Sequence, residues 1–144
     1  MDANALKLAE AAGTAMYERD RASQALGMTL EEIRPGYARM RMRVREDMVN
    51  GHDICHGGLI FTLADSTFAF ACNSYNHNTV AAGASIEFLA PARLGDVLRA
   101  TGLEQALAGR SGVYDIRVEN QEGQLIALFR GKSARIKGEV VAGL

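Results

Sequence analysis

The sequence contains few cysteines, few prolines and no excess of charge of either sign. Two cysteines among 144 residues cannot build a disulfide framework, which fits a reducing, intracellular setting. With 16 basic and 17 acidic residues the net charge is -1, so we expect neither nucleic acid nor an anionic membrane as a partner. Two prolines against 15 glycines indicate many turns and close backbone approaches, and no disordered segment.

Long apolar runs are also absent. The N-terminus "MDANALKLAEAAGTAMYERD" has no basic start followed by an apolar stretch, so we expect no signal peptide. The most apolar segment, residues 57–72, includes Thr62, Asp65 and Thr67 and is too short and too polar to cross a bilayer. Length and a hydrophobic content of 48% therefore predict one soluble cytoplasmic domain, residues 1–144.

The first third of the chain predicts a helical segment followed by two strands. Residues 1–25 form the helical segment, because residues 3–25 are rich in Ala, Leu, Glu and Lys, and Gly13 is expected to divide it. In "YARMRMRVR", residues 37–45, apolar residues alternate with arginines, which is typical of a half-buried strand. "GMTLEEIR" is its expected partner, with "PG" at 35–36 as the turn.

The remainder predicts one buried helix and four strands. Residues from Gly57 to Tyr75 are apolar almost all round, apart from a narrow stripe at helical spacing that includes Asp65. The stripe consists of positions 62, 65, 66, 69 and 73. The strands are expected at about 79–90, 96–107, 111–120 and 124–137. A long sheet wrapped around one apolar helix accounts for this order, so the expected fold class is α+β.

The segment "NGHDICHGGLIFTLAD", residues 50–65, invites a metal or thiol interpretation. Its candidate ligands are His52, Asp53, Cys55 and His56. A structural zinc site usually draws on a second cluster, which is missing here, so no metal is predicted. Adjacent Cys55 and His56 side chains diverge, and Cys72 is expected in the core, which disfavours a cysteine nucleophile. Neither a G-x-S-x-G serine elbow nor a phosphate-binding glycine loop is present.

Two features of this segment point to chemistry together. Asp65 is a carboxylate in a mostly apolar helix, which is costly unless the group is hydrogen-bonded, lies at a subunit seam or faces a cleft. Gly57 and Gly58 stand where the helix begins, and the free N–H groups of a helix start can stabilise an oxyanion at a backbone without side chains. A helix cap with tight packing is the simpler interpretation of the glycines alone.

The segment resembles the signature of hotdog-fold acyl-CoA thioesterases, closest to the phenylacetate-degradation branch. The likeness rests on Asn50-Gly51-His52, Cys55-His56-Gly57-Gly58 and Leu63-Ala64-Asp65, and extends over nearly the whole chain through "ADSTFAFACNSY", "IEFLAPARLGD" and "ALFRGKSARI". The fold alone is weaker evidence, because hotdog proteins include dehydratases and binding proteins. The resemblance implies hydrolysis of an aryl-acyl-CoA, of phenylacetyl or ring-hydroxylated phenylacetyl type, without a cofactor.

The resemblance also implies roles for particular residues. Asp65 matches the catalytic carboxylate, either as general base or as nucleophile, and the N–H of Gly57 matches the group that binds the thioester oxygen. Asn50 matches a residue that orients water or the carboxylate, and His56 a supporting position beside the oxyanion hole. In this family the site lies between two subunits, often within a tetramer built as a dimer of dimers.

Helix geometry gives a shared site a physical reason. Gly57 and Asp65 are about 12 Å apart along one helix, too far to contact one carbonyl together, whereas antiparallel packing of two such helices brings them close. The phosphates of CoA require cations, and the acyl group requires an apolar wall, for which Phe61, Phe68 and Met48 are candidates. Gly58 is a candidate contact of either part of the substrate. The candidate cations are Arg93, Arg110, Arg130 and Lys132.

The strand after the helix departs from the pattern of related branches. Some branches carry a Ser or Thr there that positions water, whereas "TVAAGASIEF" offers Ala81 and Ala82, with Ser85 shifted along.

Three alternative functions remain. The main alternative is a non-catalytic acyl-CoA or aromatic-acid binding protein on the same fold. A hydratase, whose motif we do not find, and a structural metal protein are the others.

Overall fold

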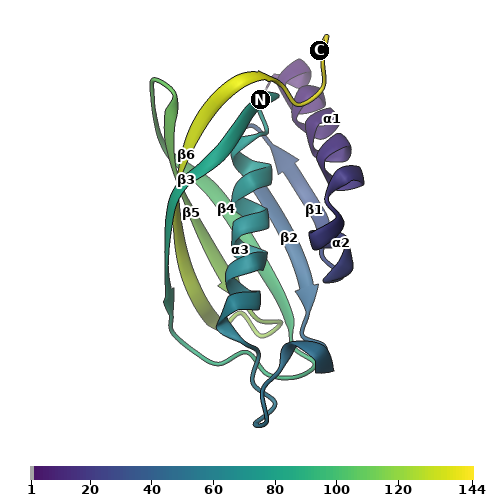
Figure 1. The fold of residues 1–144 in the computed structure, drawn as a ribbon, viewed down its shortest axis with the longest axis vertical. Coiled ribbons are helices and arrows are strands. Elements are labelled where there is room, and N and C mark those ends of the chain that lie inside the picture. Colours follow the sequence, from purple (N-terminus) through teal and green to yellow (C-terminus); the bar gives the residue numbers. More distant parts are fainter. Residues whose placement is uncertain (1) are drawn as a thin grey trace.

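The structure, a computed structural model, describes residues 2–144. Its elements are α1 (Ala3–Arg19), α2 (Arg21–Ala25), β1 (Thr29–Arg34), β2 (Tyr37–Arg43), a 3₁₀ turn (Glu46–Met48), α3 (Gly57–Cys72), β3 (His77–Phe88), β4 (Val97–Ala108), β5 (Ser111–Glu119) and β6 (Leu125–Glu139). All strand pairs are antiparallel, in the order β1-β2-β4-β5-β6-β3. Figure 1 shows α3 lying along one face of the curved sheet, with α1 beside it on the β1 side. The predicted α+β arrangement is confirmed.

The N-terminal helical segment is divided at a different residue from the one predicted. Gly13 lies inside α1, where a Cβ would come within 3.1 Å of the side chains of Leu30 and Ile33. Its missing side chain therefore lets the helix approach the sheet and does not break it. The break falls at Asp20, whose carboxylate accepts a hydrogen bond from the N–H of Ser23 at 3.0 Å and caps α2.

The central helix ends at Cys72, earlier than the predicted Tyr75. The next residue, Asn73, forms hydrogen bonds both to the last turn of the helix and to the start of the following strand. The side-chain amide of Asn73 donates to the carbonyl of Ala69 at 2.8 Å. The same side chain exchanges two hydrogen bonds with the backbone of Thr79, at 2.9 and 3.0 Å. Asn73 thus fixes the turn that carries the chain from α3 to the far edge of the sheet.

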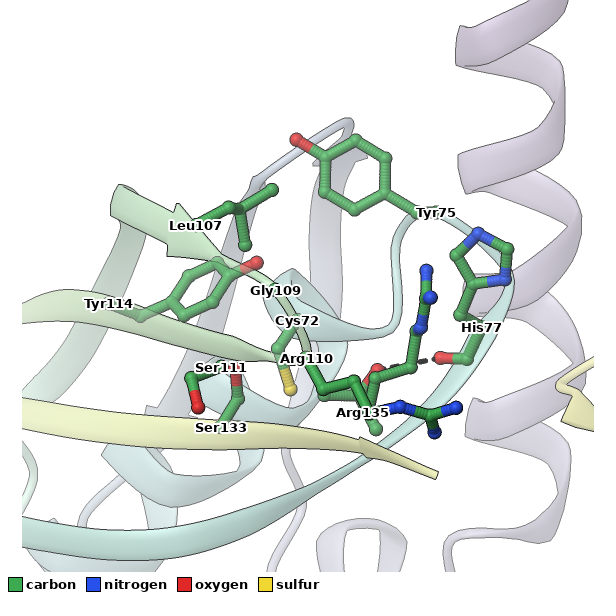
Figure 2. Close-up of a pocket in the computed structure, with 11 residues that line it drawn as sticks. Cys72, Tyr75, His77, Leu107, Gly109, Arg110, Ser111, Tyr114, Ser133 and Arg135 are labelled. Atoms are coloured by element: carbon green, nitrogen blue, oxygen red, sulfur yellow. Dashed lines mark hydrogen bonds between the residues drawn. The ribbon is translucent and has the colours of Figure 1, made fainter. Parts of the chain in front are cut away.

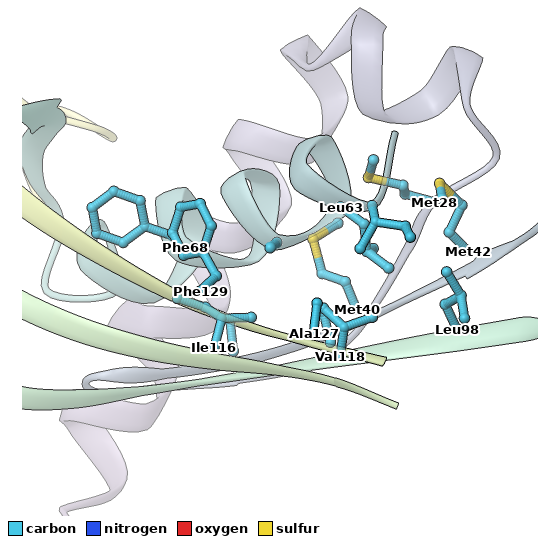
Figure 3. Packing of buried hydrophobic residues seen from close by; sticks show 14 of the residues in the cluster. Met28, Met40, Met42, Leu63, Phe68, Leu98, Ile116, Val118, Ala127 and Phe129 are labelled. Atoms are coloured by element: carbon cyan, nitrogen blue, oxygen red, sulfur yellow. The ribbon is translucent and has the colours of Figure 1, made fainter. Parts of the chain in front are cut away.

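The core fills the space between α3 and the concave face of the sheet. Figure 3 shows Leu63 and Phe68 of α3 facing buried side chains of the strands, which include Met40, Leu98, Ile116, Val118 and Phe129. Phe68 lies with ring centroids 5.7 Å from Tyr114 and 5.8 Å from Phe129. Arginines of β2 alternate with Met40 and Met42 and point away from this core, as the sequence predicts. No helix within residues 2–144 is long and apolar enough to cross a membrane.

Gly131 on β6 is the position where the core tolerates no side chain. A Cβ there would lie 2.7 to 2.8 Å from the ring of Phe68, which is fully buried and cannot move aside. We expect Gly131→Ala to lower the free energy of unfolding by about 1–3 kcal/mol through overpacking. Urea unfolding measures this change, with Gly83→Ala on β3 as the control, because a Cβ at Gly83 meets nothing within 4 Å. Equal effects of the two substitutions would contradict the packing argument.

The strand β3 is the exposed edge of the sheet. It pairs with β6 on one side only, and most of its residues are solvent-exposed on both faces, including Val80 and Phe88. A long edge strand with free backbone groups is a surface on which a second chain can pair. In this chain the same edge flanks one side of α3.

Candidate active site

The loop that leads into α3 is bonded to the connection between β3 and β4. The side-chain oxygen of Asn50 accepts hydrogen bonds from the N–H groups of His52 and Ile54, at 2.9 and 3.1 Å. The N–H of Cys55 donates to the carbonyl of Ala92 at 2.8 Å, which ties the loop to the β3–β4 connection. Asn50 therefore shapes the loop with its oxygen and leaves its amide NH₂ group free to donate.

The start of α3 presents free hydrogen-bond donors. His56 is the N-cap residue, its side chain makes no capping bond, and its carbonyl accepts from the N–H of Leu59 at 3.0 Å. The N–H groups of Gly57 and Gly58 have no acceptor within residues 2–144. Free N–H groups at the positive end of a helix form a site for an anion or for a polarised carbonyl oxygen.

An aromatic side chain that the sequence analysis did not single out closes one side of this helix start. Phe88, the last residue of β3, is 52% exposed, and a Cβ added to Gly57 would lie 2.9 Å from its ring. Gly58 has nothing within 4 Å of the same position and faces open space. Gly57 is thus the position where backbone and aromatic ring meet. An exposed aromatic beside a Pro-containing turn, "EFLAP", was the available signal in the sequence.

Asp65 lies on α3 without a hydrogen-bonding partner within residues 2–144. It is half-buried, and this desolvation raises the pKa of its carboxyl group above the ordinary value of 3.8. Its position one turn after Phe61 puts it on the side of α3 that packs towards β6, where the Phe61 and Phe129 ring centroids are 5.2 Å apart. The carboxylate therefore lies on the β6 side of α3, about 12 Å along the helix from Gly57 of the same chain.

The four predicted phosphate-binding cations are not brought together in one chain. Arg93 forms a backbone bridge with Ile54 and lies beside the site loop. Arg130 is committed to Asp115 through two hydrogen bonds of 2.6 and 2.8 Å, which hold the pKa of that carboxyl below its usual range. Lys132 is exposed on the convex face, and Arg110 lies in the β4–β5 turn.

Neither cysteine has the surroundings of a nucleophile. Burial raises the pKa of the Cys55 thiol to about 11 and that of Cys72 to about 12, so both are thiols near neutral pH. No three potential ligands among His, Cys, Asp and Glu of residues 2–144 come together as a metal-binding group. Ser85 pairs with Arg130 on the convex side of β3, so Ala81 and Ala84 are the small residues on the helix side.

A sheet wrapped around one helix, with free N–H groups where that helix starts and a half-buried carboxylate along it, defines a domain of the hotdog fold. The chain belongs to the thioesterase superfamily, because the sequence model of that family matches residues 52–127. The resemblance seen in the sequence is thereby confirmed.

Known proteins resemble the chain over most of its length. It is 46% identical to the acyl-coenzyme A thioesterase PaaI of Escherichia coli (strain K12), over 88% of this chain and 90% of that one. The structure of the E. coli PaaI protein from the phenylacetic acid degradation operon superposes with a TM-score of 0.91 at 44% identity, covering 93% of this chain and 97% of the other. A hypothetical thioesterase from Streptococcus pneumoniae TIGR4, solved with coenzyme A, superposes with a TM-score of 0.79 at 25% identity, covering 86% and 98%.

Proposed function

We propose that the protein hydrolyses an aryl-acyl-CoA, of phenylacetyl or ring-hydroxylated phenylacetyl type, to the free acid and CoA. The observation that carries the proposal is the presence, on one helix, of unbonded N–H groups at Gly57 and Gly58 and of the half-buried, unpartnered carboxylate of Asp65. The similarity to an acyl-coenzyme A thioesterase supports the thioester chemistry, and the phenylacetic acid operon of the E. coli homologue supports the aryl group.

The reaction uses the helix start to bind the thioester oxygen. The N–H of Gly57 donates to that oxygen as it becomes negatively charged, and His56 supports this oxyanion hole. Asp65 either removes a proton from the attacking water or attacks the carbonyl carbon itself. The C–S bond then breaks and CoA leaves as a thiolate. In the general-base route the acid is released directly, and in the nucleophilic route water first hydrolyses the acyl-aspartate. The free amide NH₂ of Asn50 orients the water or the carboxylate.

The two halves of the site come from two subunits in this proposal. Gly57 and Asp65 lie about 12 Å apart along α3, so one chain does not bring both to one carbonyl. Antiparallel pairing of the exposed β3 strands about a two-fold axis sets two α3 helices side by side and brings Gly57 of one towards Asp65 of the other. We further propose that two such dimers form a tetramer, and we place the enzyme in the cytoplasm.

Substrate contacts follow from the same arrangement. Arg93 is the best-placed cation for the phosphates of CoA, because its backbone is bonded to the site loop and its side chain forms no ion pair within residues 2–144. Phe88 supplies an apolar wall beside Gly57, Phe61 adds a second aromatic side chain one turn further along α3, and Gly58 leaves room at the helix start. Arg130 and Lys132 remain secondary candidates.

A hydrolysis screen tests the proposal directly. The purified protein is mixed with a panel of aryl and alkyl acyl-CoAs, and released CoA is followed with a thiol reagent such as DTNB. We expect turnover with a preference for phenylacetyl-type thioesters over straight-chain acyl groups of similar size. Saturable acyl-CoA binding in calorimetry without release of CoA would instead identify a non-catalytic binding protein. Turnover without preference would retain the enzyme and reject the aryl specificity.

The raised pKa of Asp65 predicts the acid side of the pH profile. Turnover requires the ionised carboxylate in either mechanism, and burial moves the pKa above 3.8, so kcat/KM should fall with decreasing pH before an ordinary aspartate would titrate. The sign follows from the charge: protonation removes the base, so activity is present above the raised pKa and lost below it. Stopped-flow measurement of kcat/KM against pH checks this, and full activity down to pH 3.8 would contradict it.

A further inference from the structure

A second potential binding site lies at the end of α3 remote from Gly57. It is a cavity of about 230 Å³ between the C-terminal end of α3, the β4–β5 turn and the ends of β3 and β6. We call it the tyrosine cavity. Figure 2 shows its main lining residues, Tyr75, Leu107, Arg110, Tyr114, Ser133 and Arg135. Neither Gly57 nor Asp65 lines it, and the proposed hydrolysis makes no use of its tyrosines.

The aromatic walls of the tyrosine cavity are held by one shared hydrogen-bond acceptor. One carboxylate oxygen of Glu104 accepts hydrogen bonds from the hydroxyl groups of Tyr75 and Tyr114, at 2.7 and 3.3 Å, so both rings are held in place. Burial raises the pKa of Tyr75 to about 12 and also raises that of Tyr114, so both remain uncharged phenols. Leu107 adds an exposed apolar side chain at the same site. Such walls suit a flat apolar group.

Two arginines give the cavity a positive rim. The N–H of Arg135 donates to the carbonyl of Arg110 at 2.8 Å, which keeps the two residues side by side. Neither guanidinium forms an ion pair or hydrogen bond within residues 2–144, in contrast to Arg99 and Arg130, which are bonded to acidic residues of other strands. Two adjacent arginines without a counter-charge provide the donors that a carboxylate binds strongly.

The lining also contains a hydroxyl group that makes no hydrogen bond to the protein and is accessible from the cavity. Ser133 is 2% exposed, lines the cavity, and its hydroxyl makes no hydrogen bond within residues 2–144. An unbonded hydroxyl in a cavity wall can donate to or accept from a ligand or water that enters the cavity. Gly112 contributes to the space, because a Cβ there would lie 2.7 Å from the Ser133 oxygen. A ring hydroxyl reaching Ser133 would complete its hydrogen bonding.

The size of the cavity restricts what it can hold. A dry apolar cavity of about 150 Å³ holds one benzene molecule, whereas pockets for drug-sized ligands measure roughly 300–1,000 Å³. At about 230 Å³ the tyrosine cavity accommodates one aromatic ring with a short acidic arm. We propose that it binds an aromatic monocarboxylate, with the ring between Tyr75, Leu107 and Tyr114 and the carboxylate at Arg110 and Arg135. The inference stands apart from the proposed hydrolysis, although the acid released there belongs to this class of ligand.

Calorimetry with the native protein tests the inference without any turnover. Phenylacetate is titrated into the native chain, into the Arg110→Gln/Arg135→Gln variant and into Arg43→Gln, which removes an exposed arginine remote from the cavity. We expect saturable binding that the double substitution weakens at least about tenfold, as loss of charge-assisted hydrogen bonds predicts, and that the control leaves unchanged. Phenylacetamide has the same ring without the charge, and we expect it to bind at least about tenfold more weakly than the acid.

Four results would overturn the inference. The first is absence of phenylacetate binding at millimolar concentration. The second is equal affinity for the acid and the amide, and the third is an affinity unaffected by loss of both arginines. The fourth is displacement of phenylacetate by adenosine 3′,5′-bisphosphate only while Arg110 and Arg135 are present, which would assign these arginines to the nucleotide of CoA. None of these results depends on whether Asp65 catalyses hydrolysis, so failure of one proposal leaves the other standing.

Discussion

Replacing Asp65 by Asn is expected to lower kcat for aryl-acyl-CoA hydrolysis by about 10²–10⁴-fold, the usual contribution of a positioned acid–base group. The amide is nearly the same size but can neither accept the proton of water nor attack the carbonyl. The carboxylate is half-buried without a partner, so removing its charge relieves a desolvation cost and the fold should persist. Release of CoA measures the first effect, and circular dichroism with size-exclusion chromatography measures the second.

The control for this substitution is Asp53→Asn. Asp53 lies in the loop before α3 and has φ of 57°, a conformation that Asn adopts as readily as Asp. The control removes the same charge near the helix start without touching the proposed carboxylate, so its kcat should stay close to native. Near-native turnover of Asp65→Asn, or an equal loss in both variants, would remove Asp65 from the proposed chemistry.

The two possible roles of Asp65, general base and nucleophile, can be distinguished by where the oxygen atom of the attacking water ends up. Single-turnover hydrolysis in ¹⁸O water places the label in the free acid if Asp65 activates water. If Asp65 attacks the thioester, hydrolysis of the acyl-aspartate leaves ¹⁸O in the enzyme carboxylate when water attacks the aspartyl carbon, and in the acid when it attacks the acyl carbon. Mass analysis of the peptide that contains Asp65 after one turnover therefore identifies the nucleophilic route when label appears there.

Most of the fold could be predicted because each element has a pattern of apolar and polar residues within its own stretch of the sequence. Alternation of Met40 and Met42 with arginines fixes the period of β2, and the apolar run after Gly57 fixes the buried helix. The prediction that Gly13 divides the helical segment was wrong. It rested on the low helix propensity of glycine, whereas in the structure the missing side chain allows close packing on Ile33. Only tertiary contact distinguishes these two roles of a glycine.

The candidate site was predictable to the extent that it lies in one segment. Gly57 and Asp65 are eight positions apart in the sequence, whereas Phe88 reaches Gly57 only because β3 returns along the whole length of α3. The same limit applies to Arg130, whose pairing with Asp115 depends on the register between β5 and β6. The tyrosine cavity is assembled from three separate stretches of the sequence, within 72–79, 107–114 and 133–135, and no local pattern in the sequence indicates it.

Replacing Gly57 by Pro should lower kcat about 10²–10³-fold, as loss of one oxyanion donor does in other hydrolases. Proline replaces the N–H at this position by a ring carbon and leaves the other N–H groups of the helix start in place, and the first position of a helix is where proline is best tolerated. His56 has ψ of 135°, the extended conformation that a residue before proline adopts. Gly57→Ala is the matched control, because it adds the same Cβ against Phe88 but keeps the N–H. Similar losses in the two variants would assign the effect to Phe88 and not to the donor.

Mixing the two inactive variants tests whether the site is shared. If Gly57 of one subunit works with Asp65 of its partner, a dimer of one Gly57→Pro chain and one Asp65→Asn chain contains one intact site and one doubly defective site. Random pairing at equal amounts makes half of the dimers mixed, so co-refolding should restore about a quarter of native activity per chain. A site built within one chain would give no recovery, because every chain in the mixture then carries a defect. Separately refolded variants, combined only in the assay, control for residual activity.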